Sequence, residues 1–440
     1  MIGNRIEVNI AGGLDVELPR MVRVRQKFKT PVIDDIAGAV RAQFDNQDIR
    51  DRIKPGMRIA VGCGSRGIAN VAECAGAVIA QLQALGAEPF IFPAMGSHGA
   101  ASAEGQAKVL DSLGINEQTM GCPIVSSMEV VELGRLDNGM PVYFDKQAAE
   151  ADAVVLVCRV KAHTNFRGPI ESGIIKMLVI GMGKIAGASA VHWHGFDSFK
   201  ELLPKTGQFI MEHNNFLFGV AMVENAADET ALVEIVPGEK VLEREPELLA
   251  LSKELMPRLQ FDEIDVLIVD RMGKNITGAG MDPNITGRNA RGTEWERKPD
   301  IKKIAVLGLT PETDGNATGL SGADVITMRL YRDFDPGKTY ANVIAATLLD
   351  GAAIPMIMNT DKEAVQLAVK TVLRTLPKDT KIVHIANTLE IIEIDVSENL
   401  LPYIEANPSM FEVTGELAPL DFDPEGNLAL MPSHGVKGDE

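Results

Sequence analysis

What the sequence has little of already excludes several classes of protein. Aromatic residues make up only 5% of the 440-residue chain while 45% of its residues are hydrophobic, so we expect a globular protein with a large aliphatic core. The cysteines contain no C-x-x-C pair, which argues against a zinc knuckle or a disulfide framework and fits a reducing compartment. There are four of them: Cys63, Cys74, Cys122 and Cys158.

Positive charge and long apolar runs are also scarce. The chain has 43 Lys and Arg against 61 Asp and Glu, a net charge of −18, which repels nucleic acid and anionic membranes. No apolar stretch reaches the roughly 18 residues of a membrane span, and the first residues, MIGNRIEVNIAGG, lack the apolar run of a signal peptide. We therefore expect a soluble, cytoplasmic protein with no nucleic-acid or membrane partner. The sequence does not indicate its oligomeric state.

From residue 58 onward, short apolar runs alternate with helical patterns. The run RIAVGC, a helical pattern over 71–86, the run PFIFPA and a helix over about 102–114 predict β-α-β units with a parallel sheet. Further apolar runs lie at 151–160 and 217–225, and a charged stretch at 240–262 predicts one or two helices. A second series follows, with apolar runs at 264–272, 301–309, 352–361 and 380–388 and helices near 321–329 and 361–375.

This organisation predicts an α/β protein with two α/β domains, mainly parallel sheets and an interdomain cleft. We place an N-terminal domain at 1–257 and a C-terminal domain at 258–440. The tail from about residue 418 is rich in Pro, Gly and Asp, so we expect it to be loosely structured unless it packs back on the first domain.

Polar residues follow the apolar runs of the first domain. RIAVGC leads to GSRG with Arg66, PFIFPA to MGSHG with His98, and the run at 151–160 to KAHTNF with Lys161 and His163. Ligands of parallel sheets bind beyond the carboxyl ends of the strands, so these side chains are expected to meet at one edge. A single histidine after a strand is more often a turn or capping residue, but two histidines and an arginine at equivalent places favour a site.

The stretch VGCGSRGI carries glycines in the G-x-G-x-x-G spacing at Gly62, Gly64 and Gly67. A dinucleotide site also needs an acidic residue at the end of the next strand, and the nearby Glu88 instead precedes PFIF. A monophosphate or carboxylate bound by the loop amides and Arg66 fits better. A nicotinamide-dependent dehydrogenase stays an alternative that depends on the glycine spacing alone.

Residues 161–196 gather histidines, lysines and glycines around an apolar run. His192 and His194 lie two positions apart, so they point to different sides of a strand or a helix and do not grip one metal together. One of them is a candidate ligand of a metal ion, and the other ligands of that metal must come from a bound cofactor. A glycine-rich hinge with incidental histidines is the alternative interpretation.

The motifs SRG, MGSHGAAS and the segment 161–194 resemble the nickel-dependent lactate racemase family. The resemblance implies a nickel-pincer cofactor, a pyridinium mononucleotide with two sulfur atoms and a ring carbon on nickel, made by separate maturation proteins. It implies Lys176 as the lysine that anchors the cofactor by a thioamide link and His192 as the nickel ligand, because their separation of 16 residues matches the family's.

The resemblance also implies roles in the loops after the strands. His98 and His163 match the two catalytic histidines of the family, and Arg66, with Ser65 and Gly64, matches the loop that holds the cofactor or the substrate carboxylate. The reaction expected is racemisation or epimerisation of a 2-hydroxy acid, in which a hydride moves to the cofactor and back. Histidine suits the exchange of the hydroxyl proton because its reference pKa is about 6.5.

The chain departs from the family pattern at two places. His163 and Lys176 are 13 residues apart, about three more than expected, and residues 172–175 replace the glycine pair before the lysine. The family's tyrosine and its glutamine followed by lysine are absent from the second domain, where Lys274, Asn284 and Arg288 are candidates for substrate recognition. We therefore expect a relative of that family that acts on a hydroxy acid other than lactate, and larger hydroxy acids are among the candidates. The alternative is a binding or sensor protein for a hydroxy acid or nucleotide that has lost the cofactor.

Overall fold

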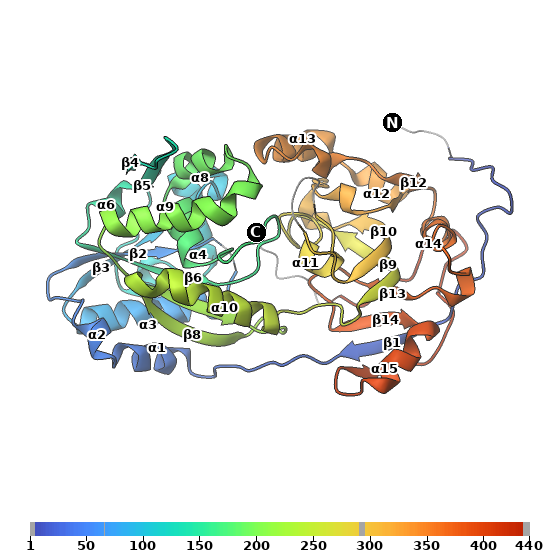
Figure 1. The fold of residues 1–440 in the computed structure, drawn as a ribbon, viewed down its shortest axis with the longest axis horizontal. Helices are drawn as coiled ribbons and strands as arrows, with labels where there is room; N and C mark the ends of the chain where they lie inside the picture. Colours follow the sequence, from blue (N-terminus) through green and yellow to red (C-terminus); the bar gives the residue numbers. More distant parts are fainter. Residues whose placement is uncertain (1–4, 66, 290–294, 434–440) are drawn as a thin grey trace. The chain divides into compact units, whose positions relative to one another are not determined.

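The structure is a computed structural model that describes residues 5–65, 67–289 and 295–433, and it divides into two compact units (Figure 1). We call Lys29–Met256 the N-terminal unit, and Met1–Phe28 with Pro257–Glu440 the C-terminal unit. The chain passes into the second unit at Pro257, next to the boundary expected from the sequence. Residues 1–28, which we expect in the first domain, belong instead to the C-terminal unit.

The N-terminal unit contains a five-stranded sheet in the order β3-β2-β6-β7-β8. Its strands are β2 (Arg58–Cys63), β3 (Glu88–Pro93), β6 (Ala153–Arg159), β7 (Phe216–Glu224) and β8 (Thr230–Pro237). The first four strands in this order run parallel and only β8 is antiparallel. Their apolar runs are buried, as parallel strands covered on both faces require, which confirms the strands predicted from the sequence.

Helices cover this sheet, and a two-stranded hairpin of β4 (Val130–Arg135) and β5 (Pro141–Asp145) lies beside it. The helices are α1 (Ile36–Phe44), α2 (Gln47–Arg50), α3 (Val71–Ala84), α4 (Ala103–Ser112), α5 (Glu117–Met120), α6 (Lys146–Ala149), α7 (Ile174–Lys176), α8 (Lys184–His192), α9 (Phe199–His213) and α10 (Val241–Leu255). A π-helical turn, Met177–Gly181, joins α7 to the segment before α8. The helices predicted at 71–86 and 102–114 are confirmed as α3 and α4, and the charged stretch forms the single α-helix α10.

The C-terminal unit contains an eight-stranded sheet in the order β12-β11-β10-β9-β13-β14-β1-β15. The strands are β1 (Met21–Gln26), β9 (Glu263–Met272), β10 (Asp300–Leu309), β11 (Val325–Thr327), β12 (Met356–Met358), β13 (Ile382–Ile385), β14 (Glu393–Ser397) and β15 (Phe411–Val413). The first five in the sheet order are parallel, and the last three pair antiparallel. Because β1 pairs with both β14 and β15, the N-terminal segment is bound to this unit.

The helices of the C-terminal unit include one correction to the sequence prediction. They are α11 (Pro283–Thr286), α12 (Met328–Asp333), α13 (Pro336–Ala345), α14 (Asp361–Lys370) and α15 (Leu401–Ala406). The helix expected near 321–329 is wrong, because Val325, Ile326 and Thr327 form the buried strand β11 between β10 and β12 and the helix begins only at Met328. Two of these three residues are β-branched aliphatics and the third is threonine, which suits a buried strand.

The described part of the tail, which we expect to be loosely structured unless it packs back on the first domain, packs instead on the C-terminal unit. Ala418 pairs with Met21, and the peptide N–H groups of Leu428 and Met431 donate to carboxylates at 2.9 and 2.7 Å. Leu428 is buried in the apolar cluster of this unit, so burial of a leucine holds the segment.

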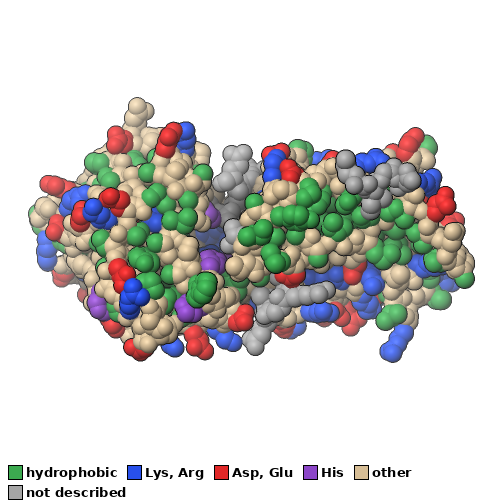
Figure 2. All heavy atoms as spheres, turned by 90° about the horizontal axis from the view of Figure 1, so that it is seen from above, with side chains coloured by type: hydrophobic (Ala, Val, Ile, Leu, Met, Phe, Trp, Pro, Cys, Tyr) green, Lys and Arg blue, Asp and Glu red, His purple; other side chains and the backbone are tan. Residues whose placement is uncertain are grey.

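Among the described residues, no single helix is long and apolar enough to cross a membrane. Only Ile174–Gly181 and Lys184–His192 reach that length and composition together, and the pair is bent by 105° at its break. Figure 2 shows acidic, basic and hydrophobic side chains intermixed over the visible face of the molecule, with hydrophobic side chains gathered on the C-terminal unit. Among the exposed large hydrophobic residues there are Tyr340 and Ile344 of α13 and the nearby Leu349.

Candidate functional site

The loops that follow β2 and β3 meet the π-helical turn that begins directly after Lys176. A Cβ atom added at Gly64 would lie 3.3 Å from Cε of Met177, so the β2 loop touches the first residue of the turn. The peptide N–H of Gly96, in the β3 loop, donates to the carbonyl of Gly181 at 3.0 Å. Two of the three loops predicted to converge are therefore held against the segment that follows the predicted anchoring lysine.

His98 lies in the β3 loop and is oriented by Ser65 of the β2 loop. The Ser65 hydroxyl is hydrogen bonded to Nδ1 of His98; Ser65 is buried and the histidine is exposed. The loop is strained, since Ala100 and Ala101 adopt left-handed backbone conformations with φ of 54° and 50°. Each costs about 1 kcal/mol or more for a residue with a Cβ atom, so the surroundings must hold the loop in place.

A buried hydrogen-bond network around Lys184 holds the His98 loop in place. The ammonium of Lys184 is fully buried; it donates to the carbonyl of Pro93 and to Oε1 of Gln106 at 3.2 Å, and pairs with Asp145 at 3.1 Å. Nε2 of Gln106 in turn donates to the carbonyl of His98 at 3.2 Å. Burial lowers the pKa of Lys184 and raises the pKa of Asp145, while the attraction between the two charges opposes both shifts. Helix α8 begins at Lys184, so the same side chain ties the His98 loop to this helix.

The loop after β6 carries His163 and is closed by a buried carboxylate. Glu171 accepts the peptide N–H of His163 at 2.7 Å and the ammonium of Lys253 at 2.7 Å. On the ring, the peptide N–H of Asn165 donates to Nδ1 of His163 at 3.0 Å. While this bond is kept, a neutral His163 carries its proton on Nε2.

His163 and His192 share one aromatic wall. The His163 ring lies 4.4 Å from the ring of Phe166 and 6.3 Å from that of Phe196. The His192 ring lies 5.2 Å from the ring of Phe196 and 5.1 Å from that of Phe199. The structure therefore brings these two predicted residues together, although 29 positions separate them in the sequence.

Lys176 acts electrostatically on both histidines. It is half-buried, and its ammonium donates to the hydroxyl of Ser172 at 3.3 Å. Burial lowers the pKa of His163 well below its ordinary value and also lowers the pKa of His192, and in each case the charge of Lys176 adds to the effect. Both rings are thus neutral at pH 7, the form that binds metals or accepts protons. His194, by contrast, is exposed to solvent.

A second buried carboxyl supports the short helix that bears Lys176. Oε2 of Glu245, on α10, accepts the peptide N–H of Ile175 at 3.0 Å, and Oε1 has no hydrogen-bond partner among the described residues. Burial raises the pKa of Glu245 to about 8. A Cβ atom added at Gly173 would lie 2.2 Å from Oε1, so only glycine leaves room for this carboxyl.

Close packing explains the first glycine of VGCGSRGI, Gly62. Gly62 lies inside β2, and a Cβ atom there would come within 2.5 Å of Leu156 and 3.0 Å of Phe92. Gly64 faces Met177, as described above. Arg66, the predicted anion-binding residue of this loop, lies outside the described residues.

The three residues predicted for substrate recognition lie in the C-terminal unit with local partners. The Lys274 ammonium donates to the carbonyl four residues further on at 2.7 Å, and the Asn284 side chain donates to Asp282 at 2.8 Å. Arg288 pairs with Asp324 at 2.6 Å and donates to two carbonyls of β10 at 2.9 Å. Arg288 thus fastens the start of β10, and these contacts alone account for its presence.

Within the described part of the chain, no group of three or more His, Cys, Asp and Glu side chains is arranged to hold a metal ion. A metal at His192 therefore needs ligands that another molecule brings. Sequence reasoning missed the buried residues that hold the loops: Gln106, Asp145, Glu171, Lys184 and Glu245. A lone charged residue among apolar neighbours, as Lys184 is in VIGMGKIAG, is the signal that finds such residues.

Residues 14–199 match the family model "lactate racemase N-terminal domain", which covers the segment with His98, His163, Lys176 and His192. Among solved structures, the chain resembles the lactate racemase apoprotein from Thermoanaerobacterium thermosaccharolyticum, with 13% identity, a TM-score of 0.51, and coverage of 83% of this chain and 94% of that one. This likeness shows the fold, with its mainly parallel sheets. No curated protein matches the sequence.

Proposed function

Because residues 14–199 match the family model of the lactate racemase N-terminal domain, we propose that this protein is a racemase or epimerase of a 2-hydroxy acid. We propose further that it uses a nickel-pincer pyridinium mononucleotide made by maturation proteins and that it works in the cytoplasm. The observation that carries the proposal is the cluster within the matched segment: the charge of Lys176 acts on both His163 and His192, which share one aromatic wall.

The residues present fit such a cofactor. Lys176 offers a half-buried primary amine for a covalent thioamide link, and His192 offers a neutral imidazole as a nickel ligand. The described side chains do not complete a metal site by themselves, which suits a cofactor that brings its own sulfur and carbon ligands. When bound, the group supplies a reversible hydride acceptor, a chemistry that no protein side chain provides.

The two remaining histidines are proposed to handle the hydroxyl proton. When Nδ1 of His98 donates to the Ser65 hydroxyl, its Nε2 has a lone pair and can take a proton from the substrate. His163, with its proton on Nε2, donates a hydrogen bond to the substrate oxygen, and the proton taken up by His98 returns to that oxygen when the hydride is given back. For the reverse direction the roles exchange, and His163 must first give up the hydrogen bond from Asn165 to become the acceptor.

The main test is covalent loading. Protein produced together with nickel-pincer maturation proteins is expected to contain about one nickel per chain and to show a mass addition on Lys176 in intact-mass and peptide analysis. The matched control is Lys176→Arg, which keeps the positive charge beside the histidines but lacks the amine needed for the link. Loss of both nickel and the mass addition in this variant is expected, and a mass addition that persists in it would contradict the proposal.

Substrate turnover is tested separately with the loaded protein. Single enantiomers of lactate and of larger 2-hydroxy acids are incubated and resolved by chiral chromatography, and inversion of at least one is expected. Loaded protein that binds such an acid tightly and inverts none would instead favour the alternative of a binding or sensor protein.

A further inference from the structure

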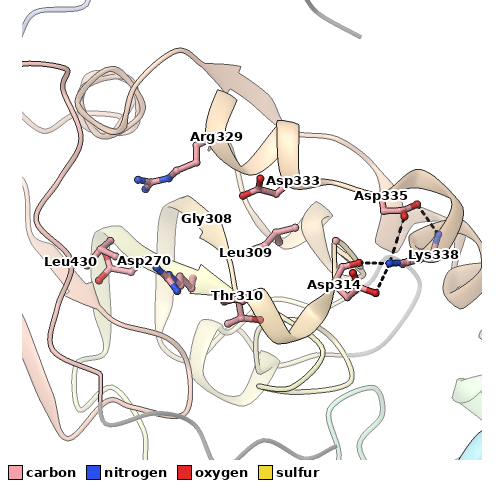
Figure 3. Close-up of a pocket in the computed structure, with 13 residues that line it drawn as sticks. Asp270, Gly308, Leu309, Thr310, Asp314, Arg329, Asp333, Asp335, Lys338 and Leu430 are labelled. Carbon is pink, nitrogen blue, oxygen red and sulfur yellow. Dashed lines mark hydrogen bonds and ion pairs between the residues drawn. The ribbon is translucent and has the colours of Figure 1, made fainter.

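A cavity of about 550 Å³ opens in the C-terminal unit at the carboxyl ends of β9 and β10 (Figure 3). Its volume is that of a site for a small organic ligand. Ligands of parallel sheets bind beyond the carboxyl ends of the strands, which is where this cavity lies. None of its lining residues belongs to the N-terminal unit, so a ligand in this cavity is bound apart from the histidines and the lysine of the proposed function.

Two arginines flank a glycine at the floor of this cavity. Gly308 of β10 is the direct partner of Arg271 in the parallel pairing of β10 with β9. Arg329 comes from α12, which follows β11 on the other side of β10. A Cβ atom added at Gly308 would lie 3.9 Å from Cγ of Arg271 and 3.9 Å from Nε of Arg329. The missing side chain therefore leaves open space between two cationic residues.

The contacts of the two arginines leave donors available for a ligand. Nη2 of Arg329 donates to both carboxylate oxygens of the buried Asp361, at 3.2 and 3.0 Å, which fixes the guanidinium while its Nε and Nη1 make no hydrogen bond within the described residues. Arg271 is exposed and has no ion-pair partner in the described part of the chain. Guanidinium groups with unused N–H donors bind carboxylate or phosphate oxygens strongly.

The third cation of the cavity is already neutralised. Lys338 pairs with Asp314 and lies 3.8 Å from Asp335, as the dashed lines in Figure 3 show. Asp333, at the end of α12, is exposed on the same cavity and makes no ion pair there among the described residues. A carboxylate only accepts hydrogen bonds, so Asp333 suits the hydroxyl groups of a ligand.

We propose that the C-terminal unit binds a small hydroxylated organic anion in this cavity. Its carboxylate or phosphate group lies over Gly308 between Arg271 and Arg329, and its hydroxyl groups reach Asp333. The other carboxylates of the lining are paired or hydrogen bonded: Asp270 accepts from Met431 and contacts His384, and Asp314 and Asp335 face Lys338.

The test is isothermal titration of the full chain with gluconate, inorganic phosphate and glucose as a neutral probe. Binding of at least one anion is expected, weakened by added salt, and which of the two binds more tightly separates a carboxylate site from a phosphate site. Glucose is expected to bind at least tenfold more weakly than the better anion. Failure of both anions to bind at millimolar concentration, or glucose binding as tightly as the anions, would overturn the proposal.

Three variants locate the site. Arg271→Gln is expected to weaken anion binding at least tenfold, whereas Arg332→Gln, an equal loss of charge on α12 outside the cavity lining, is expected to leave it within twofold. Gly308→Ala adds a methyl group that meets no atom closer than 3.4 Å, so folding should tolerate it while anion binding falls. Equal anion binding in wild type and Arg271→Gln would refute this placement even if the anion binds elsewhere.

Discussion

Substitution of the buried Glu245 by glutamine is expected to change how stability depends on pH while changing stability little in mild acid. The side chain is fully buried, and burial raises its pKa to about 8 from an ordinary value of 4.5. The folded protein therefore keeps this group neutral at pH 7, whereas the unfolded chain ionises it. A glutamine side chain has the same shape and can accept the Ile175 peptide N–H through its carbonyl oxygen.

The sign of the effect follows from proton linkage. Because the folded pKa is raised, the contribution of Glu245 to stability is fully present below pH 4.5 and is lost as the pH rises to about 8. A pKa difference of about 3.5 corresponds to about 5 kcal/mol, lost at up to about 1.4 kcal/mol per pH unit. Solvent does not screen this electrostatic effect, because the carboxyl is fully buried.

The measurement is a series of urea unfolding curves at pH values from 5 to 9 for wild type and Glu245→Gln. The two proteins are expected to differ by less than about 1 kcal/mol near pH 5, and the variant is expected to become the more stable by several kcal/mol at pH 9. Taking the difference cancels the titration of the other groups. Glu245→Leu, which removes the acceptor for Ile175, should cost about 1 to 3 kcal/mol relative to glutamine at every pH.

A constant difference between wild type and Glu245→Gln from pH 5 to 9 would refute the reasoning. It would mean that Glu245 titrates alike in the folded and unfolded states, so that its burial has no electrostatic cost. The neighbourhood makes this outcome unexpected, because the nearby thiol of Cys158 is also buried and has a pKa raised well above its ordinary value.

The remaining predictions concern other buried groups. Lys184→Met leaves Asp145 buried without its partner and should cost about 3 to 5 kcal/mol in urea unfolding; a loss below about 1 kcal/mol would show that the pair does not hold the loop. The lowered pKa values of His163 and His192 mean that the unfolded chain binds more protons at these two groups, so their contribution to stability should fall from pH 7 to 5, opposite in sign to that of Glu245; the unfolding free energy of wild type minus that of His163→Asn should therefore decrease over this range, and a constant difference would contradict it. The four cysteines are buried, so a thiol reagent should label none within minutes in native protein and all four in urea; fast native labelling would contradict their burial.

The fold was largely predictable because it depends on local patterns. The apolar runs that become β2, β6 and β9 are continuous and bounded by turns, and such runs signal buried parallel strands from sequence alone. The partners of β1 were not predictable, because β14 and β15 lie more than 360 residues away and no short-range signal links them. The sequence did not predict strand β11 for another reason, because three residues are too few to show a period of two.

The candidate site was predictable only where side chains follow strands. His98 and His163 could be placed at one edge of the sheet from topology, and their positions after β3 and β6 agree with that. What holds them could not be predicted, because Gln106 and Glu171 act through backbone atoms, and a glutamine or glutamate in a polar stretch gives no signal. In the C-terminal unit Arg271 lies near the carboxyl end of strand β9 and lines the cavity, as its place after an apolar run suggests, whereas Arg329 lies on α12 and has no such signal.

The extra residues between His163 and Lys176 can be accommodated without displacing the lysine. Lys161 and Ser172 form a pair of antiparallel backbone hydrogen bonds of 2.9 and 3.2 Å, so the chain between them leaves and returns at one point. Inserted residues within such a closed loop change its contour and leave its ends in place, at a small added entropic cost. Glu171 fills the loop from inside by accepting the peptide N–H of His163. The longer spacing is therefore compatible with an anchoring role for Lys176.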